Sequence, residues 1–267
     1  MDLGLTGRSC LVTGASSGIG RQSARLLCAE GADVLLVARG QKRLAEATEE
    51  LAAAGGGRAE ALPLDVTAAD AGVRMLATAE ERFGQLDVLV NNAGTASWRD
   101  LDDVPEEDWR LQYELNVMAP LRAMRTAIPP MAERGWGRVV NVCSTAGKRP
   151  SAAMAEYSVA KAAELSLSRL FADRYADTGV LVNAVAPGPV EAEMWMEPGG
   201  LLDQSRELSG AASREEALAA AGSKRPIGRL ARAEEIAAAI VFLCSERASY
   251  VAGAAWSVDG GTVQVII

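Results

Sequence analysis

The sequence predicts an α/β fold: a single doubly wound domain whose seven-stranded parallel sheet has helices on both faces. Short β-rich runs alternate with longer alanine- and leucine-rich stretches along the 267 residues, and such alternation implies right-handed crossovers and a mostly parallel sheet. The runs 34–37 and 88–90 are continuously apolar, as expected for strands buried on both faces. No linker or repeat divides the chain, so we expect one domain over residues 1–267.

The expected elements alternate from the first strand to the last. The β-rich runs predict strands at residues 9–13, 33–38, 58–64, 86–91, 138–143, 180–185 and 254–258. The stretches between them predict helices at residues 18–30, 42–54, 68–83, 106–134, 155–175 and 233–244. The segment 193–223 interrupts this rhythm, because it carries Gly199-Gly200 and mixes apolar with polar residues. Since a glycine pair can hinge a moving segment, we expect a substrate lid inserted within the domain.

Composition excludes several classes of function. The formal net charge of −8 and the lack of a lysine- or arginine-rich run argue against nucleic acid and membrane as partners. No histidine is present, which excludes Ser-His-Asp hydrolysis and histidine-ligated metals within this chain; we expect no metal site. The four cysteines are scattered without C-x-x-C spacing. Three lie in apolar stretches and are expected to be core thiols, whereas Cys143 directly precedes Ser144 and is a candidate oxidisable neighbour of the site. We expect a reduced, cytoplasmic protein.

A glycine-rich loop follows the first strand. Residues 13–20 read Thr-Gly-Ala-Ser-Ser-Gly-Ile-Gly and lead into the first helix. Glycines let a backbone approach a pyrophosphate closely, and a helix N-terminus offers free N–H groups and partial positive charge. In this context the loop predicts a dinucleotide site of the Rossmann fold, although a tight turn without a ligand would use the same residues. The predicted contacts are Gly14, Ser16, Ser17, Gly18, Ile19 and Gly20.

The end of the second strand indicates which dinucleotide binds. NAD-binding proteins usually place an acid here to hold the ribose 2′-hydroxyl. This chain has no carboxylate there and continues with Arg39, whose guanidinium suits a 2′-phosphate. We therefore expect NADP(H) to be preferred and NAD(H) to be possible, while a solvated turn arginine is the alternative explanation.

Tyr157 and Lys161 lie four residues apart in a stretch expected to be helical. That spacing places the phenol and the ammonium on one face of the helix. A positive charge beside a phenol favours the phenolate and makes it a better acid–base group at neutral pH. An ordinary helix with a surface lysine would show the same pair. The pair therefore indicates an active site only in combination with other motifs. These are the glycine-rich loop and Ser144, thirteen positions before the tyrosine.

Together these motifs resemble the short-chain dehydrogenase/reductase family over essentially the whole chain, with 3-oxoacyl-carrier-protein reductases as the nearest subgroup. Each piece is weak singly, and their order and spacing make the resemblance specific. One position departs from the pattern: the family often has threonine two residues after Val190, where this chain has Ala192, so one hydroxyl contact to the cofactor is missing. The matching pieces are residues 13–20, Asp65-Val66, residues 91–94, Asn116, Ser144, Tyr157, Lys161, residues 183–188 and Val190.

Besides the loop and Arg39, the resemblance implies cofactor contacts from residues that follow strand ends. Strand-end caps and ordinary turns would use the same residue types. The implied contacts are Asp65 and Val66 at the adenine, Asn92, Ala93 and Gly94 at the ribose, and Pro187, Gly188 and Val190 at the nicotinamide.

The resemblance also implies an oxidoreductase that transfers a hydride between the nicotinamide and a carbonyl compound or secondary alcohol. Tyr157 would donate or remove the proton, and Lys161 would bind the ribose hydroxyls and activate the phenol. Ser144 would hydrogen-bond the substrate oxygen, and Asn116 would hold a water that links Lys161 to solvent. Without the tyrosine–lysine pair, a turn serine and a helix-interior asparagine would be the simpler explanations.

The expected substrate wall supplies few fixed charges. We expect this wall to come from residues 95–101, 145–155 and 193–223, and it includes Trp98, Met154 and Trp195. These side chains favour an apolar or medium-sized carbonyl compound, although they also suit a core or a subunit contact. A 3-oxoacyl thioester is the first candidate substrate, and a free ketone, steroid-like or other secondary alcohol is the second. A catalytically idle NADP-binding sensor or scaffold is disfavoured, because all four candidate catalytic residues are present. The family implies a homotetramer, and the apolar tail 263–267 fits burial at a subunit contact or in the core.

Overall fold

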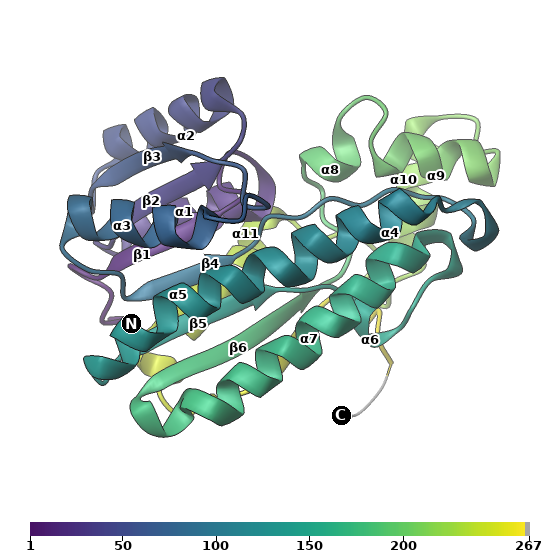
Figure 1. Ribbon diagram of the computed structural model, residues 1–267. Coiled ribbons are helices and arrows are strands. Elements are labelled where there is room, and N and C mark those ends of the chain that lie inside the picture. Colours follow the sequence, from purple (N-terminus) through teal and green to yellow (C-terminus); the bar gives the residue numbers. More distant parts are fainter. Residues whose placement is uncertain (265–267) are drawn as a thin grey trace.

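The fold is a seven-stranded parallel sheet between two layers of helices (Figure 1), seen in a computed structural model that describes residues 1–264. The strand order is β3-β2-β1-β4-β5-β6-β7. The chain order reverses at β1 and β4, and open α/β sheets bind ligands at the carboxyl ends of strands beside such a reversal. The strands are β1 (Ser9–Thr13), β2 (Asp33–Ala38), β3 (Ala59–Pro63), β4 (Val88–Asn91), β5 (Gly137–Val142), β6 (Val180–Pro187) and β7 (Ala255–Val258).

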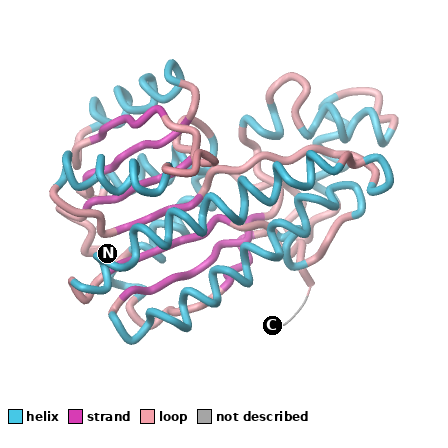
Figure 2. The backbone as a smooth tube through the Cα atoms, viewed as in Figure 1, coloured by secondary structure: helices cyan, strands magenta, loops and turns pink. Residues whose placement is uncertain are grey.

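Two hydrophobic clusters lie on opposite faces of the sheet. Cys10 and Val12 of β1 belong to one cluster and Leu11 to the other, because successive side chains of a strand point to opposite faces. Helices cover both sides of the strands in Figure 2, which confirms the predicted fold class. The first cluster packs under α1 (Gly18–Ala29), α2 (Gln41–Ala54) and α11 (Ala233–Cys244), and the second under α3 (Ala71–Phe83), α5 (Ala119–Glu133) and α7 (Ala155–Tyr175).

The long helix expected at residues 106–134 is interrupted. A π-helical turn, Glu114–Met118, joins α4 (Glu106–Tyr113) to α5, and in such a turn the hydrogen bonds span five residues rather than four. The segment is helical from residue 106 to residue 133, as predicted, but the π-helical turn within it was not predicted. Residues 106–119 contain no glycine or proline, so the sequence carries no breaker signal at this point.

Residues 193–223 form a small helical unit beside the carboxyl edge of the sheet (Figure 1). Its helices are α8 (Glu193–Met196), α9 (Leu201–Ser209) and α10 (Arg214–Ser223), where the sequence predicts a break in the alternation but not these helices. They enclose their own hydrophobic cluster, which contains Trp195 and Leu202. Gly199, between α8 and α9, has a φ of 76°, a left-handed conformation that glycine adopts without strain. We call these residues the lid unit.

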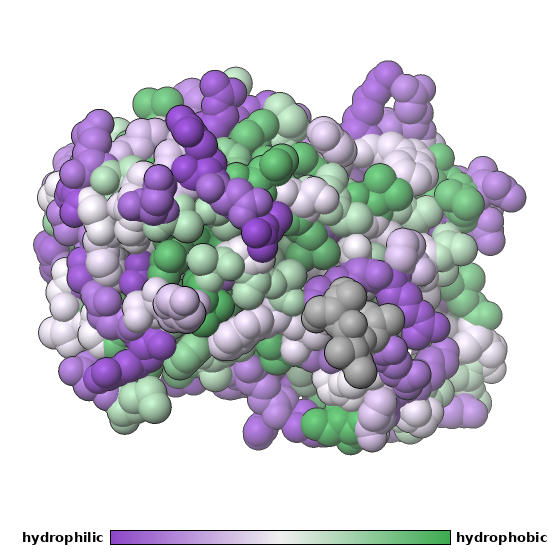
Figure 3. All heavy atoms as spheres, turned by 90° about the horizontal axis from the view of Figure 1, so that it is seen from below, coloured by the Kyte–Doolittle hydropathy of each residue, from purple (hydrophilic) through white to green (hydrophobic). Residues whose placement is uncertain are grey.

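Three further features concern membrane spans, the surface and the cysteines. No helix within residues 1–264 is both long and apolar enough to cross a membrane. The face in Figure 3 carries apolar and polar side chains side by side. All four cysteines are free and buried, as expected for the three in apolar stretches, and burial raises the pKa of the Cys244 thiol to about 12. Residues 265–267 of the apolar tail lie outside the described residues, and the expected burial of the tail stays a prediction.

Candidate active site

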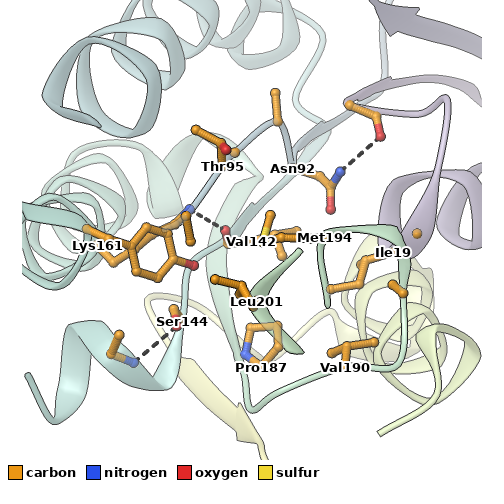
Figure 4. A pocket seen from close by; sticks show the side chains of 18 of the residues that line it. Ile19, Asn92, Thr95, Val142, Ser144, Lys161, Pro187, Val190, Met194 and Leu201 are labelled. Atoms are coloured by element: carbon orange, nitrogen blue, oxygen red, sulfur yellow. Dashed lines mark hydrogen bonds between the residues drawn. The ribbon is translucent and has the colours of Figure 1, made fainter. Parts of the chain in front are cut away.

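A cavity of about 1280 Å³ lies where β1, β4, β5 and β6 end (Figure 4). We call the part around residues 14–19 its loop end and the part around Trp98, Met154 and Trp195 its lid end. Of the residues predicted for the site, all but Gly20 and Asn116 line this cavity. In Figure 4, Ser144 and Lys161 face the same space as Pro187 and Val190, which come from the far side of the cavity.

The glycine-rich loop is held against the end of β4 at backbone distance. A Cβ placed on Gly20 would lie 2.4 Å from the Gly14 carbonyl oxygen and 2.5 Å from Asn92 Nδ2, so no larger residue fits there. Asn92 Nδ2 donates to the Thr13 carbonyl oxygen at 2.9 Å, which ties β4 to β1. Gly20 therefore shapes the loop from behind, while Gly18 at the start of α1 faces the cavity. The N-terminus of α1 opens there, and its free N–H groups suit a phosphate group.

Arg39 and Asp65 border the cavity beyond the loop. Arg39 follows β2 directly and is exposed. Hydrogen bonds from the Thr67 N–H at 3.0 Å and the Thr67 hydroxyl at 2.7 Å hold the pKa of the Asp65 carboxyl below its usual value. Arg43 of α2 reaches across to the lid unit, where its Nη2 lies 2.8 Å from Glu197 Oε1. An ion pair thus joins the lid unit to α2, whose Arg43 also lines the cavity.

Ser144 ends β5 and caps the short helix α6 (Thr145–Lys148). Its Oγ accepts a hydrogen bond from the Ala146 N–H at 3.1 Å (Figure 4). This cap satisfies one free N–H of the helix and fixes the direction of the hydroxyl, whose own proton stays available for an acceptor in the cavity. A serine at this position is therefore both a structural cap and a candidate hydrogen-bond donor.

Tyr157 and Lys161 share one face of α7, as predicted from their spacing. The Lys161 ammonium lies 5.8 Å from the centre of the Tyr157 ring. Lys161 Nζ donates to the Val142 carbonyl oxygen at 2.9 Å and to Glu164 Oε2 at 2.8 Å. Although burial alone would lower the pKa of Lys161, attraction to the Glu164 carboxylate raises it above its usual value. The ammonium is charged, and two of its three donors are already used.

Asn116 sits behind the cavity wall rather than in it. It is fully buried in the π-helical turn, and its Nδ2 donates to the Gln112 carbonyl oxygen at 2.9 Å. Its Oδ1 has no hydrogen-bond partner within residues 1–264. A Cβ placed on Gly94 would lie 3.4 Å from this oxygen and 3.9 Å from Lys161 Nζ. The missing side chain of Gly94 thus leaves room between an unpaired acceptor and the lysine, as a bridging water would need.

Sequence reasoning missed part of the lining and one buried contact. Glu164 is the main omission, because a glutamate in a predicted helix gives no sign of burial. Its only sequence signal is its place three residues after Lys161, a spacing at which side chains on a helix meet. The segments 95–101, 145–155 and 193–223, which were expected to form the substrate wall, also line the cavity with Thr95, Thr145, Arg149 and Leu201. The lining residues outside those segments that were not predicted include Leu111, Leu115, Lys224, Arg225 and Thr262.

The donor set fits a dinucleotide and not a metal. Within residues 1–264, no group of three or more histidine, cysteine, aspartate or glutamate side chains is placed to hold a metal ion. The glycine-bordered loop, the open N-terminus of α1 and Arg39 match the phosphate groups of a dinucleotide. The remaining lining at Ser144, Tyr157 and Lys161 offers hydroxyl and ammonium donors for hydroxyl or carbonyl oxygens.

Comparison with known proteins points to one kind of enzyme. The family model described as enoyl-(acyl carrier protein) reductase matches residues 14–263. Cis-4-hydroxycyclohexanecarboxylate dehydrogenase of Sinomonas cyclohexanicum is 39% identical over 97% of each chain. A 3-oxoacyl-acyl-carrier-protein reductase of Thermotoga maritima is 33% identical over 97% of this chain and 99% of its own. L-sorbose reductase of Gluconobacter frateurii, solved with NADPH and L-sorbose, superposes with a TM-score of 0.92, 34% identity and full coverage of both chains.

Proposed function

Because this oxidoreductase belongs to the short-chain dehydrogenase/reductase family, we propose that it transfers a hydride between NADP(H) and a carbonyl compound or secondary alcohol. The observation that carries the proposal is that Ser144, Tyr157 and Lys161 line one cavity. The glycine-rich loop lines the same cavity. A hydroxyl donor, a phenol and a charged ammonium beside a dinucleotide loop suit proton transfer coupled to hydride transfer.

Four residues of the chain have separate roles in the proposed reaction. When bound, the nicotinamide supplies or accepts the hydride. During reduction Tyr157 donates its hydroxyl proton to the substrate oxygen, and during oxidation its phenolate takes that proton back. Ser144 donates a hydrogen bond to the same oxygen. Lys161 uses its remaining donor on the ribose hydroxyls and stabilises the phenolate, and the free Oδ1 of Asn116 holds the water through which protons return.

NADP(H) is the proposed cofactor. Arg39 lines the cavity directly after β2, where a carboxylate would be needed to favour NAD. Its guanidinium can bind a 2′-phosphate in a bidentate manner. The L-sorbose reductase that superposes over the whole chain was solved with NADPH, which supports the same choice. NAD(H) stays a possible second cofactor, and the contacts proposed for both are the loop residues and strand ends named above.

The proposed substrate is a free ketone or secondary alcohol of small to medium size. The lid end of the cavity is lined by Trp98, Met154 and Trp195, and the relatives named for free hydroxy acids and sugars match over nearly their full length. A 3-oxoacyl thioester is the second candidate, supported by the Thermotoga maritima relative. An acidic carrier protein would need a basic docking surface, and the net charge of −8 weighs against it.

The decisive experiment combines a substrate screen with one substitution. The purified chain is assayed with NADPH and NADH against ketones, hydroxy acids and 3-oxoacyl thioesters. Tyr157→Phe should lower turnover of the best substrate at least about 100-fold while NADPH binding is kept, since it removes only the proton donor. Tyr175→Phe, on the same helix but stacked on Phe171, is the matched control and should keep full turnover. NADPH binding with no turnover across the panel would favour an idle sensor instead.

We also propose a homotetramer in a reducing, cytoplasmic setting. Apolar side chains are exposed on α4 and α7: Tyr113 on α4, and Val159 and Leu170 on α7. Exposed apolar residues gathered on a helix face are typical of subunit contacts. The four buried, free thiols suit a reducing compartment. The molar mass in solution, measured by light scattering, distinguishes a tetramer from a dimer or monomer.

A further inference from the structure

Glu164 is a buried carboxylate that the proposed mechanism does not use. It lies three residues after Lys161 on α7, and its side chain is 2% exposed. A buried carboxylate is costly unless it is paired and hydrogen-bonded. Glu164 has such a partner in Lys161, whose Nζ donates to Glu164 Oε2 at 2.8 Å. The carboxylate therefore touches the ammonium that the proposed mechanism uses.

The ion pair changes what Lys161 presents to the cavity. An isolated ammonium beside a phenol would act as a full positive charge, whereas an ammonium 2.8 Å from a carboxylate acts more as a dipole. The Val142 carbonyl oxygen fixes a second donor of the same ammonium at 2.9 Å. Lys161 is thus locked in place before any ligand arrives, with one donor left and its charge largely balanced.

We propose that Glu164 is a positioning residue, which orients Lys161 and limits how strongly that lysine favours the phenolate of Tyr157. This inference rests on the proposed function, because it assigns Tyr157 the acid–base role. The ionisable groups that act on the pair are Tyr157 on the same helix and Cys143 at the end of β5. Lys148 of α6 is a further charged group, which acts on Cys143.

The direction of the effect follows from the sign of the charge. Burial raises the pKa of the Glu164 carboxyl, and Lys161 opposes that rise only in part. The geometry favours the anion, because an ammonium 2.8 Å from Glu164 Oε2 stabilises the charged carboxylate. A nearby anion disfavours formation of a second anion. Removing the charge of Glu164 while keeping its shape should therefore favour the phenolate and move its formation to lower pH.

The test uses Glu164→Gln, which keeps the size of the side chain and an acceptor for Lys161. Near-ultraviolet absorbance of tyrosinate is titrated in the NADPH-bound full-length protein, and the signal lost in Tyr157→Phe is taken as that of the site. We expect the midpoint of this signal to move to lower pH by about one unit in Glu164→Gln. Glu164→Leu, which also removes the charge, should shift it in the same direction.

Two controls separate charge from packing. Asp173→Asn removes an exposed carboxylate of the same helix, bonded to Arg169, and should leave the midpoint unchanged. Glu164→Asp keeps a buried charge and should shift it less than Glu164→Gln does. An unchanged midpoint in Glu164→Gln or Glu164→Leu, or an equal shift in Glu164→Asp, would overturn the proposal. The titration needs no substrate, so its outcome is independent of the turnover test of Tyr157→Phe. The role of Glu164 and the proposed function can therefore each fail while the other holds.

Discussion

The loop end and the lid end of the cavity are built in different ways. At the loop end the backbone sets the shape, since Gly20 packs so closely on Gly14 and Asn92 that an added Cβ has no room. At the lid end side chains set the shape, since Trp98, Met154 and Trp195 come from three separate segments. A site built from backbone depends on the spacing of glycines, whereas a site built from side chains depends on how distant segments pack.

This difference decides what each end tolerates. Substitution at the loop end acts directly on the path of the chain between β1 and α1. Substitution at the lid end acts on a small cluster that is separate from the two clusters of the sheet. We therefore expect loop-end changes to act on cofactor binding and lid-end changes to act locally on the lid unit.

The largest effect is expected for Gly20→Ala. The new Cβ must displace the Gly14 carbonyl, 2.4 Å away, and a loop moved by about 1 Å can lose on the order of 100-fold in a positioned interaction. NADPH affinity, measured by fluorescence quenching, should fall by at least that factor. The free energy of unfolding should fall by about 1–3 kcal/mol. Gly40→Ala is the control, because a Cβ there meets nothing within 4 Å. Equal NADPH affinity in both variants would show that the loop is not built by backbone contact.

A smaller and local effect is expected for Trp195→Ala. This side chain is 8% exposed and belongs to the cluster of the lid unit, and removing a buried tryptophan costs about 3–5 kcal/mol. Because that cluster is small, the loss should appear as local opening. Hydrogen exchange of α9 amides should accelerate at least about tenfold while β4 and β5 amides keep their protection. Faster exchange throughout the sheet would mean that the lid unit and the sheet open together.

The smallest effect is expected for Arg39→Ala. A hydrogen bond to a charged group contributes about 1.5–3 kcal/mol, so NADPH affinity should fall roughly tenfold or more while NADH affinity stays the same. Lys42→Ala removes a neighbouring charge that does not line the cavity and serves as the control. Titration calorimetry with both cofactors measures the two affinities. An equal loss of affinity for NADH would show that Arg39 does not determine which cofactor binds.

Much of the fold was predictable because local pattern and tertiary structure agree. The strands Ser9–Thr13 and Asp33–Ala38 and the helix Ala155–Tyr175 have the expected bounds, since continuous apolar runs and breaker residues mark them. The π-helical turn at Glu114–Met118 and the helices of the lid unit were not predicted. The π-helical turn has no glycine or proline signal. In the lid unit Gly199-Gly200 marks a break but does not specify the helices, because short helices depend on packing more than on periodicity.

The residues of the candidate site also differ in whether local sequence spacing predicts them. Tyr157, Lys161 and the glycine-rich loop stand at spacings that a helix or a turn converts directly into proximity. Glu164 was missed because burial depends on what packs on α7, which no local pattern states. The room beside Gly94, between Asn116 and Lys161, likewise arises from three segments that meet only in the folded chain.

The π-helical turn at Glu114–Met118 allows the position of the Asn116 amide to be changed separately from the packing of α4 and α5. A point substitution usually changes both. A π-helical turn holds one residue more than the regular helix that could replace it. Deleting a single residue there should straighten the segment and let α4 and α5 keep their partners α7 and α3, while the Asn116 amide is carried away from the lysine. Such a deletion would remove the proposed proton path while the sheet and its covering helices stay as they are.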